Sequence, residues 1–162
     1  SETWDFVKKV LMIDLNGNQI VRNKLDFEIN YREVKSINHN ESFLAGWFQF
    51  PEGDKVEAEY KIKELLIHRK NTQPLNWPTA GSTFRNPKDK FAAKLIEDCG
   101  LKGYQIGGAQ VSEKHANFII NLGNATALDI ENIITYIQNV VLKNKKIQLH
   151  TEIKIIGEQN GS

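Results

Sequence analysis

The feature that most constrains the fold is an apolar pattern with helical spacing near the C-terminal end. Side chains three and four positions apart lie on one face of a helix. This spacing is followed by Ile130, Ile133, Ile134, Ile137, Val140 and Val141. Thr126, with Asp129 three positions later, is typical of a capping pair at the start of such a helix. The pattern therefore predicts an amphipathic helix.

Other patterns predict strands and a further helix in the same region. Residues 91–99 place their apolar side chains on one helical face, and Gly100 follows as a C-terminal stop. Residues 118–121 form a short apolar run, which predicts a strand. Residues 147–156 alternate between apolar and polar, which predicts a half-buried strand with Glu152 on its polar face. Together these elements predict an α+β fold.

The N-terminal part is predicted to begin with a hairpin. Residues 4–14 are rich in Val, Ile, Leu and aromatic residues, which favours a strand. The sequence LNGN at 15–18 predicts a tight turn, because Asn-Gly tolerates the positive φ that such a turn requires. Residues 19–24 supply the partner strand, and residues 42–50 predict another strand.

A domain boundary is predicted in the middle of the chain. Residues 56–71 have apolar positions at helical spacing with charges between them, which predicts a helix. Residues 72–78 contain two prolines and no periodicity, which indicates a linker. We therefore expect two domains, at residues 1–73 and 74–162.

Composition excludes several classes of protein. Of the 162 residues, 40% are hydrophobic and 25% are charged, as in ordinary globular proteins. The net charge of +1 gives no reason to expect nucleic acid or an anionic membrane as a partner. No apolar run approaches the ~20 residues of a membrane span. The single cysteine, Cys99, is compatible with a reducing cytoplasm, and the histidines lack metal-ligand spacing, so no metal is expected.

A dense polar motif, AGSTFRNP, begins at residue 80. It is followed by the polar residues Ser112, Lys114, His115 and Asn117. A hydrophobic core does not require these groups in this order, so they favour a site for a polar, anionic ligand. Structural alternatives stay open, because Ser82 could stabilise a turn or cap a helix, Asn86 could cap the helix after Pro87 and Lys114 could be solvent-exposed. The Gly107-Gly108 pair could present N–H groups to a phosphate or form a plain tight turn.

Five segments of this region carry a family resemblance. They are GSTFRNP at 81–87, LIE at 95–97, GLKG at 100–103, VSEKHANFIIN at 111–121 and TEIKIIG at 151–157. They resemble the C-terminal domain of the UDP-N-acetylenolpyruvoylglucosamine reductases, the MurB family of flavoenzymes. The similarity extends more weakly to Tyr31-Arg32 and to residues 1–5, so it covers almost the whole chain.

The resemblance implies both a fold and a reaction. The expected fold is the remainder of a flavin-binding lobe, with antiparallel strands plus a helix, followed by a small α+β substrate-binding domain. The expected reaction is the reduction of UDP-N-acetylglucosamine enolpyruvate to UDP-N-acetylmuramate with NADPH through FAD. This step of peptidoglycan precursor synthesis serves the cell wall, cell shape and cell division, and it takes place in the cytoplasm.

The resemblance also implies roles for particular residues. Ser82 delivers a proton to C2 of the enolpyruvyl group after hydride from reduced flavin reaches C3. Arg32 stabilises the negative charge that develops, and Glu152 is expected to be protonated in the working state. Further substrate contacts are assigned to Asn86, Lys114 and Tyr31.

Two of these assignments have alternatives. Arg32 could form a surface ion pair with Glu33 or Asp26, and Glu152 could be a solvated strand carboxylate. The family usually has a serine two residues after the arginine, where this chain has Val34. This departure puts the local hydrogen bonding around Arg32 in doubt.

The flavin is expected to be held largely outside this sequence. In the family, the glycine-rich segments that bind the flavin pyrophosphate precede the point that corresponds to residue 1. We therefore predict an N-terminal flavin-binding segment or chain as a partner, and we predict that residues 1–162 alone neither bind FAD tightly nor turn over. Two alternatives to the reductase are a non-catalytic module that binds a nucleotide sugar and a related FAD oxidoreductase with another substrate.

Overall fold

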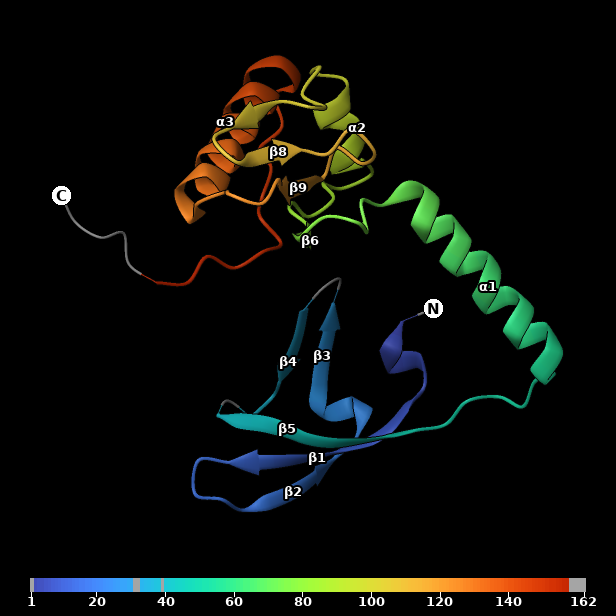
Figure 1. The fold of residues 1–162 in the computed structure, drawn as a ribbon. Coiled ribbons are helices and arrows are strands. Elements are labelled where there is room, and N and C mark those ends of the chain that lie inside the picture. Colours follow the sequence, from blue (N-terminus) through green and yellow to red (C-terminus); the bar gives the residue numbers. More distant parts are fainter. Residues whose placement is uncertain (1, 31–32, 39, 158–162) are drawn as a thin grey trace. The chain divides into compact units, whose positions relative to one another are not determined.

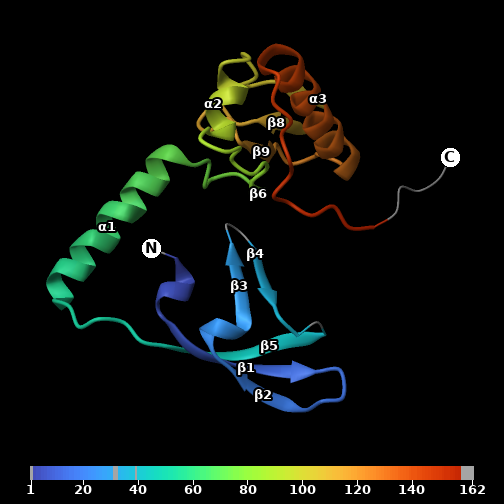
Figure 2. The same cartoon turned by 180° about the vertical axis from the view of Figure 1, so that it is seen from behind.

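The computed structural model describes residues 2–30, 33–38 and 40–157 (Figures 1 and 2). The chain divides into two compact units, Ser1–Ala58 and Glu59–Ser162. Helix α1, Lys55–Thr72, begins in the first unit and continues in the second. These units are defined by compactness. The predicted division by function, into a flavin lobe at residues 1–73 and a substrate-binding domain at residues 74–162, stays a prediction.

The first unit is built around an antiparallel sheet with the strand order β2-β1-β5. These strands are β1 (Val7–Asp14), β2 (Gln19–Arg22) and β5 (Glu41–Phe48). The predicted hairpin is confirmed, since β1 and β2 pair across the turn and Gly17 has a φ of 83°. The first strand begins later than predicted because Thr3–Asp5 form a 3-10 turn (η1), in which the Asp5 carboxylate accepts from the Glu2 N–H at 2.8 Å.

A second, two-stranded ladder in this unit was not predicted. A 3-10 turn, η2 (Lys24–Asp26), leads into β3 (Phe27–Asn30), which pairs with β4 (Glu33–Ser36). The core of the unit is small: the buried side chains Val10, Met12 and Phe27 are packed against by Trp4, Val7 and Ile29.

The second unit is an antiparallel sheet covered by two helices. Its strands have the order β6-β9-β8-β7 and are β6 (Thr79–Ser82), β7 (Gln105–Ile106), β8 (Ala109–Val111) and β9 (Phe118–Asn121). The helices are α2 (Ala92–Glu97) and α3 (Ala127–Lys145). Antiparallel sheets combined with separate helices confirm the predicted α+β class.

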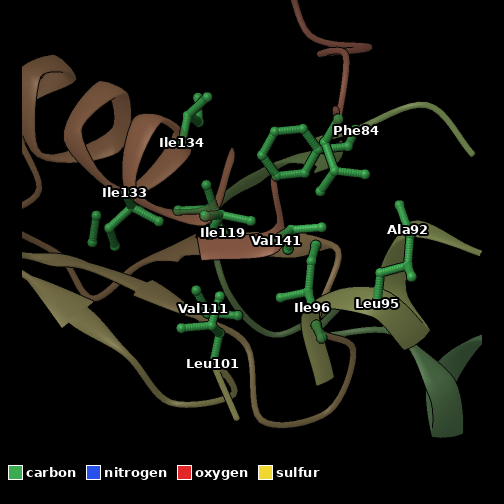
Figure 3. Packing of buried hydrophobic residues seen from close by; sticks show 14 residues of the cluster. Phe84, Ala92, Leu95, Ile96, Leu101, Val111, Ile119, Ile133, Ile134 and Val141 are labelled. Carbon is green, nitrogen blue, oxygen red and sulfur yellow. The ribbon is translucent and has the colours of Figure 1, made fainter. Parts of the chain in front are cut away.

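The core of the second unit confirms the predicted face of α3 and most of that of α2 (Figure 3). On α2, Ala92, Leu95 and Ile96 are buried, whereas Phe91 precedes the helix and is 71% exposed. On α3, the side chains of Ile133, Ile137 and Val141 are completely buried. At the start of α3, the Thr126 hydroxyl accepts from the Asp129 N–H at 3.1 Å. The Asp129 carboxylate in turn accepts from the Thr126 N–H at 2.9 Å, so the predicted capping pair is present.

The prediction of a regular strand at residues 147–156 is wrong. This segment forms only an isolated bridge, between Thr151 and Phe84. The carbonyl of Leu149 accepts from the side chain of Gln138 at 2.9 Å, a bond that a neighbouring strand would otherwise supply. Period-two alternation shows which side chains face the core, but a strand also requires a continuous partner.

Helix α1 is present as predicted, but none of its side chains is buried. Among the residues that the structure describes, no helix is long and apolar enough to span a bilayer.

Candidate functional site

Ser82 is the last residue of β6, at an irregular point in the sheet. It pairs with Phe118 of β9, and the register shifts between Thr79 and Ser82. Gly81 has a φ of 85°, a conformation in which side chains are strained. The glycine before Ser82 therefore permits a change in strand direction at the candidate site.

The segment after Ser82 is held between two other parts of the chain. On one side, the Thr83 N–H donates to the Asn117 carbonyl at 2.8 Å. On the other side, the Thr83 carbonyl accepts from the Glu152 N–H at 2.8 Å. The backbone of Glu152 is thus bonded to the residue that follows Ser82. The structure brings these two candidate residues, 70 positions apart by their numbers, onto hydrogen-bonded neighbouring segments.

Asn117 fixes the path of the chain next to Ser82. Its side chain is 4% exposed, and it makes two hydrogen bonds to the backbone of Phe84. Its Oδ1 accepts from the Phe84 N–H at 3.0 Å, and its Nδ2 donates to the Phe84 carbonyl at 2.9 Å. Sequence reasoning placed Asn117 in a ligand-binding cluster, whereas its side chain forms a structural link of the kind that a paired strand would make.

Ser112 and His115 also have structural contacts. The Ser112 hydroxyl accepts from the N–H groups of Lys114 and His115, at 3.1 and 3.3 Å. His115 is half-buried, its ring lies 4.8 Å from that of Phe118, and its Nδ1 accepts from the Asn117 N–H. Burial lowers the pKa of His115 below its ordinary value of 6.5, because desolvation disfavours the charged form.

Asn86 lies in the loop that leads to α2. Its Oδ1 accepts from the N–H of Ala92, the first residue of that helix, at 3.0 Å. This is the capping contact that sequence reasoning left open as the alternative. Asn86 is nevertheless exposed. Its role as a substrate contact stays a prediction.

Lys114 is exposed and contacts the end of α1. Its Nζ donates to the carbonyl of Lys70 at 2.8 Å, a favourable position for a cation because helix C-termini carry partial negative charge. Lys114 also lines a pocket of about 210 Å³ together with Pro74, Leu75, Asn76, Trp77, Gln110, Ser112, Glu113 and Ile120. Its assignment as a substrate contact stays a prediction.

Tyr31 and Arg32 lie outside the described residues. Val34, which stands where the family usually has a serine, is in β4 opposite Ile29 and is 38% exposed. The proposed ion-pair partner Glu33 has its carboxylate 3.3 Å from the Nζ of Lys35.

The Gly107-Gly108 pair packs against the start of α3. A side chain on Gly108 would collide with the backbone of Ala125, and one on Gly107 would collide with the Asp129 carboxylate. The Gly108 N–H donates to Asp129 at 3.3 Å. These glycines are therefore explained by close packing in a tight turn, the second of the two possibilities.

The described residues of the first unit do not fit a flavin dinucleotide by themselves. A pyrophosphate is usually held by backbone N–H groups of a glycine turn or a helix N-terminus. In this part of the structure the glycine with a positive φ is Gly17, whose N–H donates to the Asp14 carbonyl within the hairpin turn. The described residues of the first unit therefore supply no glycine turn for a pyrophosphate.

Comparisons with known proteins agree with this fold. A family model described as UDP-N-acetylenolpyruvoylglucosamine reductase, C-terminal domain, matches residues 73–156. The crystal structure of the reductase (MurB) from Thermus caldophilus is similar with a TM-score of 0.78 at 27% sequence identity, covering 93% of this chain and 53% of that chain. The fold is thus that of the C-terminal part of a MurB-type reductase.

Two relatives carry the same name at higher identity. The UDP-N-acetylenolpyruvoylglucosamine reductase of Nitrosomonas eutropha is 45% identical over 168 residues, covering 100% of this chain and 51% of that protein. The one from Thiobacillus denitrificans is 46% identical over 160 residues, covering 98% and 49%. The chain belongs to the UDP-N-acetylenolpyruvoylglucosamine reductase family, and it spans about half the length of the curated relatives that it matches.

Proposed function

We propose that this chain is part of a cytoplasmic enzyme that reduces UDP-N-acetylglucosamine enolpyruvate to UDP-N-acetylmuramate with NADPH. Residues 74–162 would form its substrate-binding domain, and residues 1–73 would belong to its flavin lobe. The observation that carries the proposal is the contact between Glu152 and the residue after Ser82, within the segment that matches the family's C-terminal domain.

The reaction adds a hydride and a proton across the C2–C3 double bond of the enolpyruvyl group, and NADPH is oxidised to NADP⁺. FAD, held largely by a segment outside this sequence, would supply the redox chemistry. The proton comes from the Ser82 hydroxyl and goes to C2. A serine is a poor acid, so the donor requires neighbouring groups that stabilise its alkoxide for a short time.

The remaining roles follow the charge that develops on the substrate. Arg32 would bind the carboxylate next to C2, where the negative charge is spread, through paired hydrogen bonds. Glu152, whose backbone is bonded to the residue after Ser82, would be the third catalytic residue beside C2. Asn86, Lys114 and Tyr31 would contact the nucleotide sugar.

The test combines this chain with the N-terminal half of the Nitrosomonas eutropha relative, FAD, NADPH and the enolpyruvyl substrate. We expect substrate-dependent oxidation of NADPH that falls by roughly 100-fold or more in Ser82→Ala, the size of effect associated with general acids. Ser42→Ala, in exposed strand β5, serves as the matched control and should retain the full rate.

Two outcomes contradict the proposal. A folded, flavin-loaded complex that oxidises no NADPH with this substrate would exclude the reductase assignment. Binding of the nucleotide sugar that survives Ser82→Ala, with no flavin dependence, would instead support the non-catalytic binding module.

A further inference from the structure

The candidate residues Ser82 and Glu152 come from segments that no regular sheet joins. Strand β6 ends at Ser82, and the segment 147–156, which carries Glu152, forms only an isolated bridge. On the other side of Ser82 along the chain, Gly81 has a φ of 85° and the register of β6 shifts. Ser82 is therefore not part of a continuous ladder, and its position relative to Glu152 depends on a few individual hydrogen bonds.

The three residues after β6 are bonded to the segment that carries Glu152. The Glu152 N–H donates to the Thr83 carbonyl at 2.8 Å, and the Arg85 N–H donates to the His150 carbonyl at 2.9 Å. Phe84 lies between these two bonds, at the isolated bridge. At such a position of an antiparallel pair, a residue points its own N–H and carbonyl away from the partner segment. The peptide groups of Phe84 therefore require partners on the opposite side.

Asn117 supplies both of these partners with its side-chain amide. Its Oδ1 accepts from the Phe84 N–H at 3.0 Å and its Nδ2 donates to the Phe84 carbonyl at 2.9 Å. We call these two bonds the Asn117 clamp. The Asn117 carbonyl accepts from the Thr83 N–H at 2.8 Å, and its N–H donates to Nδ1 of His115 at 3.3 Å. Each of the four polar groups of Asn117 thus has a partner within the chain.

The Asn117 clamp fixes an orientation that apolar packing leaves open. Phe84 is 1% exposed, and its ring lies in the core of the second unit (Figure 3). Burial of a ring is not directional, so it holds Phe84 in the core without orienting its peptide groups. Two hydrogen bonds to one amide do orient them. They thereby set the path of the chain between Ser82 and the bond to Glu152.

We propose that Asn117 is a positioning residue of the reductase. Its amide holds the junction that places the Ser82 hydroxyl relative to Glu152 and the substrate, while the side chain itself is 4% exposed and buried beneath the site. The inference rests on the proposed function for the roles of Ser82 and Glu152. The junction can be measured without turnover, which separates a failure of this inference from a failure of the proposed function.

Two variants of Asn117 and one matched control test the inference. Asn117→Ala removes both bonds of the Asn117 clamp. At about pH 8, Asn117→Asp keeps the shape and the acceptor but loses the donor, because an ionised carboxylate only accepts. The control is Asn121→Ala at the other end of β9, which removes an Oδ1 that accepts from the N–H groups of Gly123 and Ala125. Circular dichroism checks that all three variants are folded.

The first measurement is hydrogen exchange at the amides of Arg85 and Glu152, whose acceptors none of the substitutions removes. We expect both amides to exchange at least tenfold faster in Asn117→Ala and to a smaller extent in Asn117→Asp. In Asn121→Ala they should keep their rates relative to the rest of the second unit. An equal increase in Asn117→Ala and Asn121→Ala would report a general loss of stability and would overturn the inference.

The second measurement is NADPH oxidation by the complex of this chain with FAD and the N-terminal half of the Nitrosomonas eutropha relative. We expect kcat to fall at least tenfold in Asn117→Ala, with KM for the enolpyruvyl substrate within about twofold, because a displaced group costs rate rather than binding. The solvent deuterium isotope effect on kcat should rise, since proton transfer from Ser82 becomes slower. An unfolded fraction of the enzyme cannot change this ratio.

The outcomes separate the two proposals. Wild-type values of kcat and of the isotope effect in Asn117→Ala would overturn the positioning role, and so would an equal loss of kcat in Asn121→Ala. An inactive wild-type complex, in which Asn117→Ala still speeds exchange at Arg85 and Glu152, would overturn the proposed function alone.

Discussion

Asn117 and Ser112 are buried polar side chains whose hydrogen bonds fix backbone next to the candidate site. Asn117 is joined to Phe84, 33 positions away, by two bonds. A buried polar group is costly unless it is bonded, so such a residue is retained only where its partner is in place. Around Ser82, part of the polar motif therefore supports the site rather than contacting a ligand.

Replacing Asn117 should destabilise the second unit. Asn117→Ala leaves the N–H and the carbonyl of Phe84 without their side-chain partners in a buried position. We expect the free energy of unfolding to fall by about 2 kcal/mol, measured by urea denaturation. Asn139→Ala, at an exposed position of α3, is the control and should change stability little. An unchanged midpoint for Asn117→Ala would mean that these two bonds contribute nothing net.

Among the elements, α3 and α1 show how much a helix depends on its surroundings. Both have apolar residues at helical spacing, and both form helices. Helix α3 has one apolar stripe, which packs into the core of the second unit. Helix α1 contains no buried residue and contributes no side chain to either core cluster.

The start of α3 offers a test at this scale. Thr126→Ala removes the hydroxyl that accepts from the Asp129 N–H. We expect a loss of about 1 kcal/mol in the free energy of unfolding, because an N-terminal amide loses its partner. Thr135→Ala, on the exposed side of the same helix, controls for the loss of a threonine methyl and hydroxyl. Equal stability of the two variants would contradict the capping role.

At the scale of the whole molecule, the chain contains one unit with a substantial core and one with a small core. The larger cluster belongs to the second unit, which contains the segment that matches the family's C-terminal domain. The first unit has few buried side chains and no glycine turn that is available for a pyrophosphate among its described residues. Both observations agree with a cofactor site built mainly by chain that this sequence does not include.

The 162-residue chain by itself should therefore bind FAD weakly. After incubation with FAD and removal of the free cofactor, we expect the visible flavin absorbance to correspond to far less than one FAD per chain. Addition of the N-terminal half of the relative should restore it, which serves as the positive control. One FAD retained per isolated chain would show that this prediction is wrong.

Local features of the structure could be predicted from sequence. The β1–β2 turn follows from Asn-Gly, and α3 follows from its capping pair and apolar period. Helix α2 ends at Glu97, earlier than the predicted stop at Gly100, which has a φ of 70° in the turn that follows. The motifs from residue 81 to 157 identified the family, which the comparisons confirm. Turn, cap and period signals depend on residues within a few positions of one another, so sequence alone determined them.

Only the tertiary structure decided how the polar motif is used. It shows that Asn117 holds Phe84, that Asn86 caps α2, and that residues 147–156 form a single bridge in place of a strand. It also shows that Glu152 is bonded next to Ser82. Each of these outcomes depends on which donor and acceptor groups form hydrogen bonds with each other in the folded chain. Those partners are often distant along the chain, and neither propensity nor periodicity specifies them.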